Sequence, residues 1–366
     1  MKQKTICFFC GDVTRCGGTE RASTMIGNLL HRQGLHRVIF LSLMEHDSKP
    51  FFPLDEGIIR CRLGDAWINP GPGYLKILPK LRKFLESQDV DIVIDVDIVL
   101  DCLSIPASAG LKVKVISWEH FNCQFEESVM YRKLILKYLV KRSDYVITLT
   151  ERDKEQYIRH LKRQERIQTI CNPIEELVLI PETKKEKWII TVGRLAPEKG
   201  LEYLLEVARR ILKKYPDWRW ILLGEGELRP VLEDGIRGGQ LEDRLILKGS
   251  VKNVCGYLQR SQIYVMTSRY EGLGICLVEA KAQGLPCVAF DVPTGPAELI
   301  ADGTNGYLSP AFDCDKMEEK IERLIEDAEL RGHFSLNARL GMEKCRPDFI
   351  LAQWNQVIEQ VCPSIS

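Results

Sequence analysis

The feature that most constrains the fold is an alternation of short β-branched runs with longer helical segments. In the first half of the chain, runs such as TICFFC, RVIFLSL, DIVIDV and VKVISW alternate with helical patterns over 20–33, 74–87, 127–141 and 151–161. Continuous Val, Ile and Leu runs joined by helices are typical of parallel strands that are buried on both faces. Residues 1–170 are therefore predicted to form a doubly wound, Rossmann-like α/β domain.

The alternation stops over residues 171–187 and then starts again. This stretch contains two prolines and a cluster of charges, which predicts a linker and hinge. WIITVG, WRWILLG, RLILKG, IYVMTS and PCVAFD then alternate with further helical segments. Residues 188–346 are therefore predicted to form a second Rossmann-like domain, so the fold class is α/β with two such domains.

A final helix is predicted over residues 347–362. Its apolar residues recur at helical spacing, so the helix needs a surface to pack against. They are Phe349, Ile350, Trp354, Val357 and Ile358.

Composition excludes several classes of protein. The formal net charge is zero, which gives no indication of a nucleic-acid partner. The 13 cysteines are odd in number and lie mostly in apolar runs, which favours free thiols in a reducing compartment. The start of the chain lacks a secretory signal pattern, and no run reaches the ~18 apolar residues of a membrane span. We expect a soluble, cytoplasmic protein.

The carboxyl ends of parallel strands are where α/β domains bind ligands, and two facing domains place these ends along a shared cleft. After the first strand, Gly17 and Gly18 lead into a helix that begins near Thr19. Such a turn lets the backbone approach an anion, although a plain strand-to-helix turn has the same sequence. It is neither a P-loop nor a dinucleotide fingerprint.

Two cations follow the first strand of the second domain. Arg194 and Lys199 flank the turn of GRLAPEKG that opens the next helix, and together they are suited to bind a diphosphate. The alternative is a pair of solvated charges, one of which helps to cap the helix.

The stretch EGLGICLVEA carries a carboxylate at each end. Gly272, Leu273 and Gly274 expose backbone N–H groups after Glu271, and a helix that begins near Gly274 places Glu279 in its second turn. A carboxylate among apolar neighbours needs partners, and vicinal sugar hydroxyls are suitable ones. The alternative is a glutamate that extends to solvent.

In the first domain, His120 directly follows the strand VKVISW, whereas the other five histidines lie in settings typical of solvated side chains. A structural role for His120 is the alternative. Glu119 is a weaker candidate for an acceptor-side base. Asp95 and Asp97 form an Asp-x-Asp pair that some enzymes use for a metal, but we interpret them as residues at a strand end and cleft rim.

These motifs occur in an order that resembles glycosyltransferase family 4, whose members are retaining enzymes of the GT-B fold. The resemblance rests on GRLAPEKG, SRYEGLGICLVEAKAQGLPCVAFDVPTGPAELI and NGYL, with GGTER and WEHFN in the first domain. It extends over nearly the whole chain and is strongest over 190–310. The most similar members are bacterial hexosyl- and N-acetylhexosaminyltransferases that build capsule, lipopolysaccharide or lipid-linked oligosaccharide.

The resemblance implies a role for each matching residue. It assigns Glu279 to the ribose, Glu271 with the backbone of Gly272 to Gly274 to the donor sugar, and Arg194 and Lys199 to the diphosphate leaving group. It places His120 near the reacting carbon and Gly17 and Gly18 against phosphate or acceptor. Gly224, Gly226 and the turn 249–253, which includes Val251, would flank the nucleobase. The final helix would pack back on the first domain.

The resemblance also implies a reaction and its partners. The donor would be a UDP-linked nucleotide sugar, and the reaction would need no metal or other cofactor. The acceptor would be a glycan or a polyprenyl-linked lipid. Basic amphipathic stretches over 74–85 and 130–142 suit docking on anionic lipid, unless they are core helices with a solvated basic face. An epimerase, a phosphorylase and a non-catalytic partner of a transferase are the alternatives. The intact motifs disfavour the last.

Overall fold

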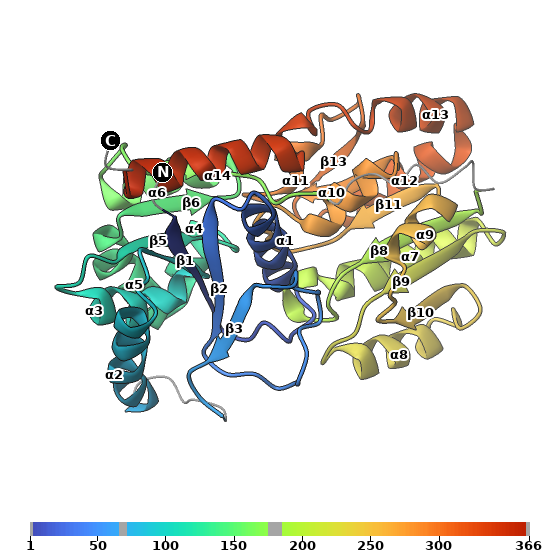
Figure 1. The fold of residues 1–366 in the computed structure, drawn as a ribbon. Coiled ribbons are helices and arrows are strands. Elements are labelled where there is room, and N and C mark those ends of the chain that lie inside the picture. Colours follow the sequence, from blue (N-terminus) through green and yellow to red (C-terminus); the bar gives the residue numbers. More distant parts are fainter. Residues whose placement is uncertain (1–2, 66–71, 175–184, 364–366) are drawn as a thin grey trace. The chain divides into compact units, whose positions relative to one another are not determined.

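The computed structural model describes residues 3–65, 72–174 and 185–363, so most of the predicted linker lies outside the described residues. The chain divides into two compact units. The first unit comprises residues 1–173 together with 344–366, and the second comprises residues 174–343. Each unit has one parallel sheet (Figure 1).

The first unit contains a seven-stranded sheet in the order β3-β2-β1-β4-β5-β6-β7. Every described pairing within it is parallel, and β1 pairs level with β2 from Lys4↔His36 to Cys10↔Ser42. The strands are β1 (Lys4–Cys10), β2 (His36–Ser42), β3 (Ile59–Arg62), β4 (Ile92–Val96), β5 (Lys114–Trp118), β6 (Tyr145–Thr148) and β7 (Ile167–Thr169).

Helices connect these strands as the sequence predicts, with one break. The pattern over 127–141 predicts a single helix, but the structure has two, because Val129 adopts an extended conformation between them. A short helix after β4 was not predicted. The helices are α1 (Gly18–Arg32), α2 (Pro72–Ser87), α3 (Asp101–Ser108), α4 (Cys123–Ser128), α5 (Met130–Tyr138) and α6 (Glu151–Leu161).

The last helix, α14 (Pro347–Val361), belongs to the first unit. Its Trp354 is fully buried and meets Trp118 of β5 edge-to-face, with ring centroids 4.9 Å apart. Lys4 of β1 forms an ion pair with Glu359 at 2.5 Å. Phe349, expected on the apolar face, is instead 49% exposed, because it lies in the first turn beyond this contact. The chain end is thus part of the first core.

The second unit contains a six-stranded parallel sheet in the order β10-β9-β8-β11-β12-β13. The last strand begins at the glycine of the NGYL motif and was not predicted as a strand. The strands are β8 (Trp188–Val192), β9 (Arg219–Leu223), β10 (Leu245–Gly249), β11 (Ile263–Met266), β12 (Cys287–Asp291) and β13 (Gly306–Pro310).

The helices of the second unit follow the predicted segments to within two residues for the first four. They are α7 (Leu201–Lys214), α8 (Arg229–Gly238), α9 (Val254–Arg260), α10 (Ile275–Ala282), α11 (Pro296–Leu299), α12 (Cys314–Glu326) and α13 (Ala328–Asn337).

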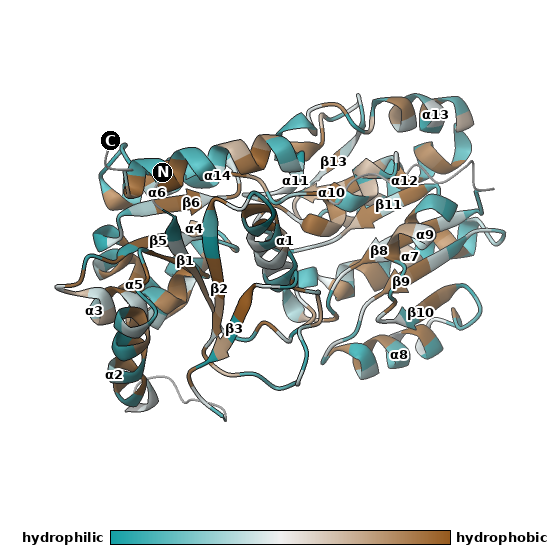
Figure 2. Ribbon diagram, in the orientation of Figure 1, coloured by the Kyte–Doolittle hydropathy of each residue, from teal (hydrophilic) through white to brown (hydrophobic). Residues whose placement is uncertain are grey.

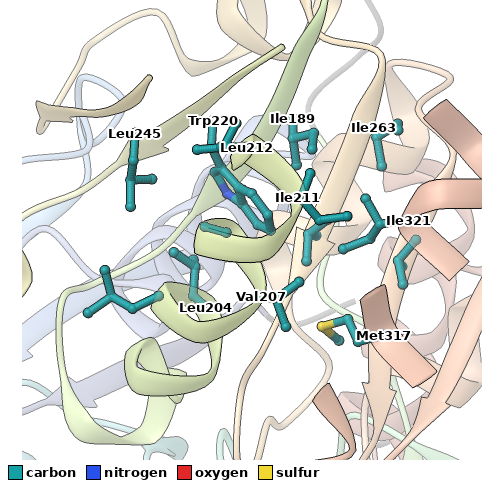
Figure 3. Packing of buried hydrophobic residues seen from close by; sticks show 14 of the residues in the cluster. Ile189, Leu204, Val207, Ile211, Leu212, Trp220, Leu245, Ile263, Met317 and Ile321 are labelled. Atoms are coloured by element: carbon teal, nitrogen blue, oxygen red, sulfur yellow. The ribbon is translucent and has the colours of Figure 1, made fainter. Parts of the chain in front are cut away.

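The core of the second unit is built on one face of α7. Leu204, Val207 and Ile211 are fully buried, and Figure 3 shows them beside strand residues and α12. Recurrence at three and four residues places them on one side of the helix. Figure 2 shows apolar residues along the strands and hydrophilic residues on the helices of each unit. Burial of each sheet on both faces leaves the carboxyl ends of the strands as its accessible functional edge.

Candidate active site

The second unit has a pocket at the point where its strand order reverses. Strands β8 and β11 are neighbours, but the chain proceeds from β8 toward β9 and from β11 toward β12. Their following loops therefore leave in opposite directions and open a crevice, which is the usual ligand site of such sheets. A pocket is lined there by residues from both loops, including Gly193, Arg194, Lys199, Thr267 and Ser268.

Lys199 and Glu271 meet in this region. The Lys199 Nζ lies 2.6 Å from Glu271 Oε1, and the Ser268 hydroxyl donates to the same oxygen at 2.6 Å. Burial alone would lower the pKa of Lys199, but the adjacent Glu271 carboxylate outweighs it and the pKa is raised. A quarter of the Lys199 side chain stays exposed. The structure thus brings together the two residues that the sequence assigned to phosphate and sugar.

Arg194 lies at the same pocket but is more exposed. It forms an ion pair with Glu198, four residues later, and 53% of its side chain is exposed. Both cations of the predicted diphosphate clamp therefore have a carboxylate partner in this structure.

The turn between Glu271 and α10 explains why a glycine stands at its end. Gly274 is the N-cap of α10 with φ +83°, a conformation that favours glycine. Gly272, Leu273 and Gly274 are buried, and the Thr294 hydroxyl donates to the Glu271 carbonyl oxygen. The helix begins where it was predicted to begin.

Glu279 lies in the second turn of α10, as predicted, but it is half-buried instead of buried. Leu277, Val278 and Ala280 next to it are buried, so α10 presents Glu279 from the edge of its apolar face. The ribose contact implied for Glu279 stays a prediction.

Gly224 and Gly226 allow two loops to approach each other. A side chain at Gly224 would overlap the Gly193 carbonyl, and one at Gly226 would overlap the backbone of Leu195. These glycines therefore fit the turn after β9 against the loop that carries Arg194. Val251 is half-buried in the turn before α9. No contact in the structure tests the nucleobase assignment of these residues.

In the first unit, His120 follows β5 as predicted and is 9% exposed. Its ring lies 4.4 Å from that of Trp118. Burial lowers the pKa of His120 to about 3, so the imidazole is neutral at physiological pH. Its Nε2 has no hydrogen-bond partner in the described part of the chain. This nitrogen is itself buried, and a neutral imidazole carries no charge that would attract a phosphate.

Glu119 is not an acceptor-side base. It is fully buried, and its Oε1 accepts hydrogen bonds from the backbone of His120 at 2.8 Å and Phe121 at 2.7 Å. Its other oxygen accepts from the Tyr157 hydroxyl. Both oxygens are therefore used within the protein. Glu119 positions the loop that carries His120.

Gly17 is the N-cap of α1, and Gly18 is its first residue. A side chain at Gly17 would overlap the Glu20 carboxylate. The carboxylate of Glu20, in the first turn of α1, therefore occupies the space beside Gly17.

The Asp-x-Asp pair is part of a buried charge network. Asp95 is fully buried, accepts from Ser104, and does not lie at a rim as expected. Burial and the nearby Asp101 raise the pKa of Asp95 well above its usual value. Asp97 forms an ion pair with Arg132 at 3.0 Å, and Arg132 also meets Glu126 at 2.6 Å. Among the described residues, no group of three or more His, Cys, Asp or Glu has the geometry of a metal site.

Sequence reasoning missed two features of the first unit. Arg132 was expected on a basic amphipathic face, but it is buried between two carboxylates. His46 was classed with the solvated histidines, but its Nδ1 lies 2.6 Å from the buried Asp12. Arg132 pairs with Asp97 across 35 residues and His46 with Asp12 across 34, so no local pattern reveals these two pairs. Only the placement of Asp12 two residues after a strand was a signal.

Comparison with known proteins identifies the family. Residues 16–176 match the model described as Glycosyltransferase Family 4, and residues 178–341 match that of Glycosyl transferases group 1. An uncharacterized glycosyltransferase of Haemophilus influenzae is 32% identical over 359 residues, covering 97% of this chain and 100% of the relative. The chain belongs to glycosyltransferase family 4.

Other similar proteins support the family 4 assignment and the fold. The amylovoran biosynthesis glycosyltransferase AmsD of Erwinia amylovora is 26% identical, covering 94% of this chain and 97% of AmsD. The structure of the pneumococcal O-GlcNAc transferase GtfA, in complex with UDP and GlcNAc, superposes with a TM-score of 0.81 at 17% identity over the full length of both chains. The fold of this family 4 glycosyltransferase is therefore GT-B.

Proposed function

We propose that this glycosyltransferase moves a hexose or N-acetylhexosamine from a UDP-sugar to a glycan or lipid-linked acceptor, with retention of the anomeric configuration, in the synthesis of bacterial surface polysaccharide. The observation that carries the proposal is the Lys199–Glu271 pair at the strand-order reversal of the second unit. It combines a cation for a diphosphate with a carboxylate for sugar hydroxyls at one place.

The names of similar proteins support the direction of this proposal. AmsD is named for amylovoran biosynthesis, and a relative from Staphylococcus aureus is named a poly(ribitol-phosphate) α-N-acetylglucosaminyltransferase. GtfA was solved with UDP and GlcNAc. A UDP-linked donor and a surface-glycan acceptor are consistent with these names.

Charge development explains the roles of the cations. When the anomeric C–O bond breaks, the sugar gains oxocarbenium character and negative charge appears on the departing diphosphate. Arg194 and Lys199 would exchange their Glu198 and Glu271 partners for this diphosphate. Preorganised donors of this kind lower the barrier by several kcal/mol. Glu271, released from Lys199, then accepts hydrogen bonds from sugar hydroxyls. The backbone N–H groups of Gly272 to Gly274 donate hydrogen bonds to sugar oxygens.

The remaining residues position the donor. Glu279, half-exposed on α10, accepts from the two ribose hydroxyls. The neutral His120 hydrogen-bonds the donor sugar near its reacting carbon, and Gly17 and Gly18 lie against phosphate or acceptor. Gly224, Gly226 and Val251 flank the nucleobase. No step of this reaction requires a metal ion.

A donor panel tests the proposal. The protein is incubated with UDP-glucose, UDP-galactose, UDP-GlcNAc, UDP-GalNAc and GDP-mannose, and release of nucleoside diphosphate is measured without acceptor. Hydrolysis of one or more UDP-sugars, lost in Lys199→Ala, is expected. Activity with GDP-mannose alone would overturn the UDP assignment, and no hydrolysis of any donor would overturn the site.

Docking on anionic lipid is the part of the proposal that concerns location. None of the described helices is long and apolar enough to cross a membrane. On α5, Met130, Tyr131, Leu134 and Tyr138 are exposed beside the exposed Lys133 and Lys137, whereas Ile135 and Leu136 face the core. Exposed apolar and basic side chains on one helix are complementary to an anionic bilayer surface.

Flotation with vesicles tests this location. Binding to vesicles that contain phosphatidylglycerol, but not to phosphatidylcholine alone, is expected, with loss of binding in a Met130→Ser/Leu134→Ser variant. No flotation with anionic vesicles would remove the membrane component and leave the donor assignment unaffected.

A further inference from the structure

The loops after β1 and β2 in the first unit bring the exposed His46 against the buried Asp12. Asp12 follows β1 by two residues, and His46 follows β2 by four. The two strands end level with each other, and Leu43 continues the ladder by donating to the Cys10 carbonyl at 2.8 Å. Asp12 and His46 therefore lie at the carboxyl edge of the sheet, Asp12 in the loop that leads to Gly17 and Gly18 and His46 in the loop between β2 and β3.

Asp12 is buried, and its carboxylate is the acceptor in its hydrogen bonds. One oxygen accepts from the Thr14 backbone at 2.8 Å and from its hydroxyl at 2.5 Å, and the other accepts from His46 Nδ1 at 2.6 Å. Burial opposes the charged form of Asp12, but the bonds from Thr14 and His46 outweigh it and the pKa is lowered. An ionised carboxylate cannot donate, so the proton must be on His46 Nδ1.

In a neutral ring, this position of the proton leaves Nε2 of His46 as a hydrogen-bond acceptor. The His46 side chain is 62% exposed, whereas Asp12 is 2% exposed. In the described part of the chain, His46 Nε2 has no protein partner. A histidine that only held the loop would need no such exposure of its ring.

Arg60 fixes the loop on both sides of His46. It binds the Glu45 carboxylate with two bonds of 2.7 and 2.9 Å, and it donates to the Ser48 carbonyl at 2.7 Å. Further along, Arg32 pairs with Asp55. The loop is therefore held independently of His46, and the ring is presented from a rigid support.

We infer that His46 is an acceptor-binding residue, whose Nε2 accepts a hydrogen bond from a hydroxyl of the glycan acceptor, and that Asp12 is the positioning residue that sets its tautomer. This inference rests on the proposed transfer function. The ligand class is a polyol or sugar hydroxyl, because a neutral imidazole nitrogen accepts from a hydroxyl and attracts no phosphate charge.

The test uses the whole protein with octyl glucoside, octyl galactoside and octyl N-acetylglucosaminide as acceptor probes and the UDP-sugar that the donor panel selects. His46→Ala should lower kcat/KM for the acceptor about 10-fold, while the Kd for UDP stays unchanged. His46→Gln, whose amide oxygen can accept the same bond, should retain more activity. His160→Gln is the matched control, since His160 Nδ1 pairs with Glu127 at 3.1 Å on a helix away from the strand ends.

Asp12→Asn separates positioning from loop folding. An asparagine that keeps its bond from Thr14 presents an N–H to the ring, so the proton moves to His46 Nε2 and the acceptor nitrogen is lost. The Asn change should therefore lower transfer in the wild-type background and have no further effect in His46→Ala. Equal effects in both backgrounds would show that Asp12 only supports the loop.

Failure of the inference is distinct from failure of the proposed function. If the wild type hydrolyses no UDP-sugar, the function is wrong; if it transfers and His46→Ala transfers equally well, only the inference is wrong. If the wild type hydrolyses a donor but uses no probe as acceptor, ¹⁵N-histidine NMR decides. A shift of the His46 Nε2 signal with the octyl glycosides supports the inference, and no shift overturns it.

Discussion

The two units place charge at the carboxyl ends of their sheets in different ways. In the second unit, Arg194 and Lys199 lie at a pocket and remain 53% and 25% exposed. In the first unit, Arg132 is 11% exposed and Glu126 is fully buried. A partly exposed ion pair can exchange its partner for a ligand at small cost, whereas a buried one cannot. Similar residue types therefore lie partly exposed at a pocket in one unit and largely buried in a charge network in the other.

The largest effect is expected from a substitution that breaks the buried charge network. Arg132→Leu leaves Asp97 and Glu126 without their cation, and loss of one partner of a buried pair costs about 3–5 kcal/mol. Hydrogen exchange by mass spectrometry, which follows each unit separately, should show the loss in the first unit. Arg159→Leu is the control, because Arg159 and Glu155 are both exposed. Equal protection in the two variants would contradict the stabilising role of Arg132.

The next effect is a loss of transfer activity with little change in stability. Lys199→Ala should reduce transfer about 10²–10³-fold by removing a donor to the leaving group. Glu279→Ala should also lose most transfer because the ribose contact is removed. The melting temperature should stay close to that of the wild type in both variants. Near-wild-type turnover in both would show that the pocket at β8 and β11 is not the donor site.

A pH experiment sharpens the difference between the units. Burial, followed by the charge of Asp97, raises the pKa of Glu119 to about 7, above the value near 4.5 expected in the unfolded chain. The folded state then binds more protons between these values, so this group's contribution to stability falls as pH rises from about 4.5 to 7. Glu119→Gln should reduce the fall in unfolding free energy between pH 4.5 and 7 by roughly 1–3 kcal/mol. An unchanged slope in urea unfolding across this range would contradict the assignment.

The smallest effect is expected at Arg194. Because Arg194 is 53% exposed in its i,i+4 pair with Glu198, which is 15% exposed, Arg194→Ala should change the unfolding free energy by no more than about 1 kcal/mol. Transfer should fall about 10-fold, less than in Lys199→Ala, since one of two cations remains. Kinetics with saturating donor checks this ranking. A larger loss in Arg194→Ala would exchange the roles of the two cations.

Local pattern was enough to predict most of the fold. The β-branched runs and helical periods located the two parallel sheets, and α6 spans Glu151–Leu161 as predicted. Gly274 marked the start of α10 because its left-handed conformation ends the preceding loop. The GT-B assignment came from the order of the motifs.

Errors arose where tertiary contacts decide. The periodicity over 127–141 does not show that Val129 is extended, and the run around Asp95 does not show that its side chain points into the core. The pairing of Asp12 with His46 spans 34 residues and depends on which strands are adjacent.

The return of α14 to the first unit has a consequence for how the protein is made. Residues 174–343 form a continuous segment, so the second unit can fold as soon as it leaves the ribosome. The first unit lacks Trp354 against Trp118, and the Lys4–Glu359 ion pair, until the final residues are synthesised. The part of the protein that is translated first is therefore completed last, and a chain that stops before α14 leaves the surface beside His120 uncovered.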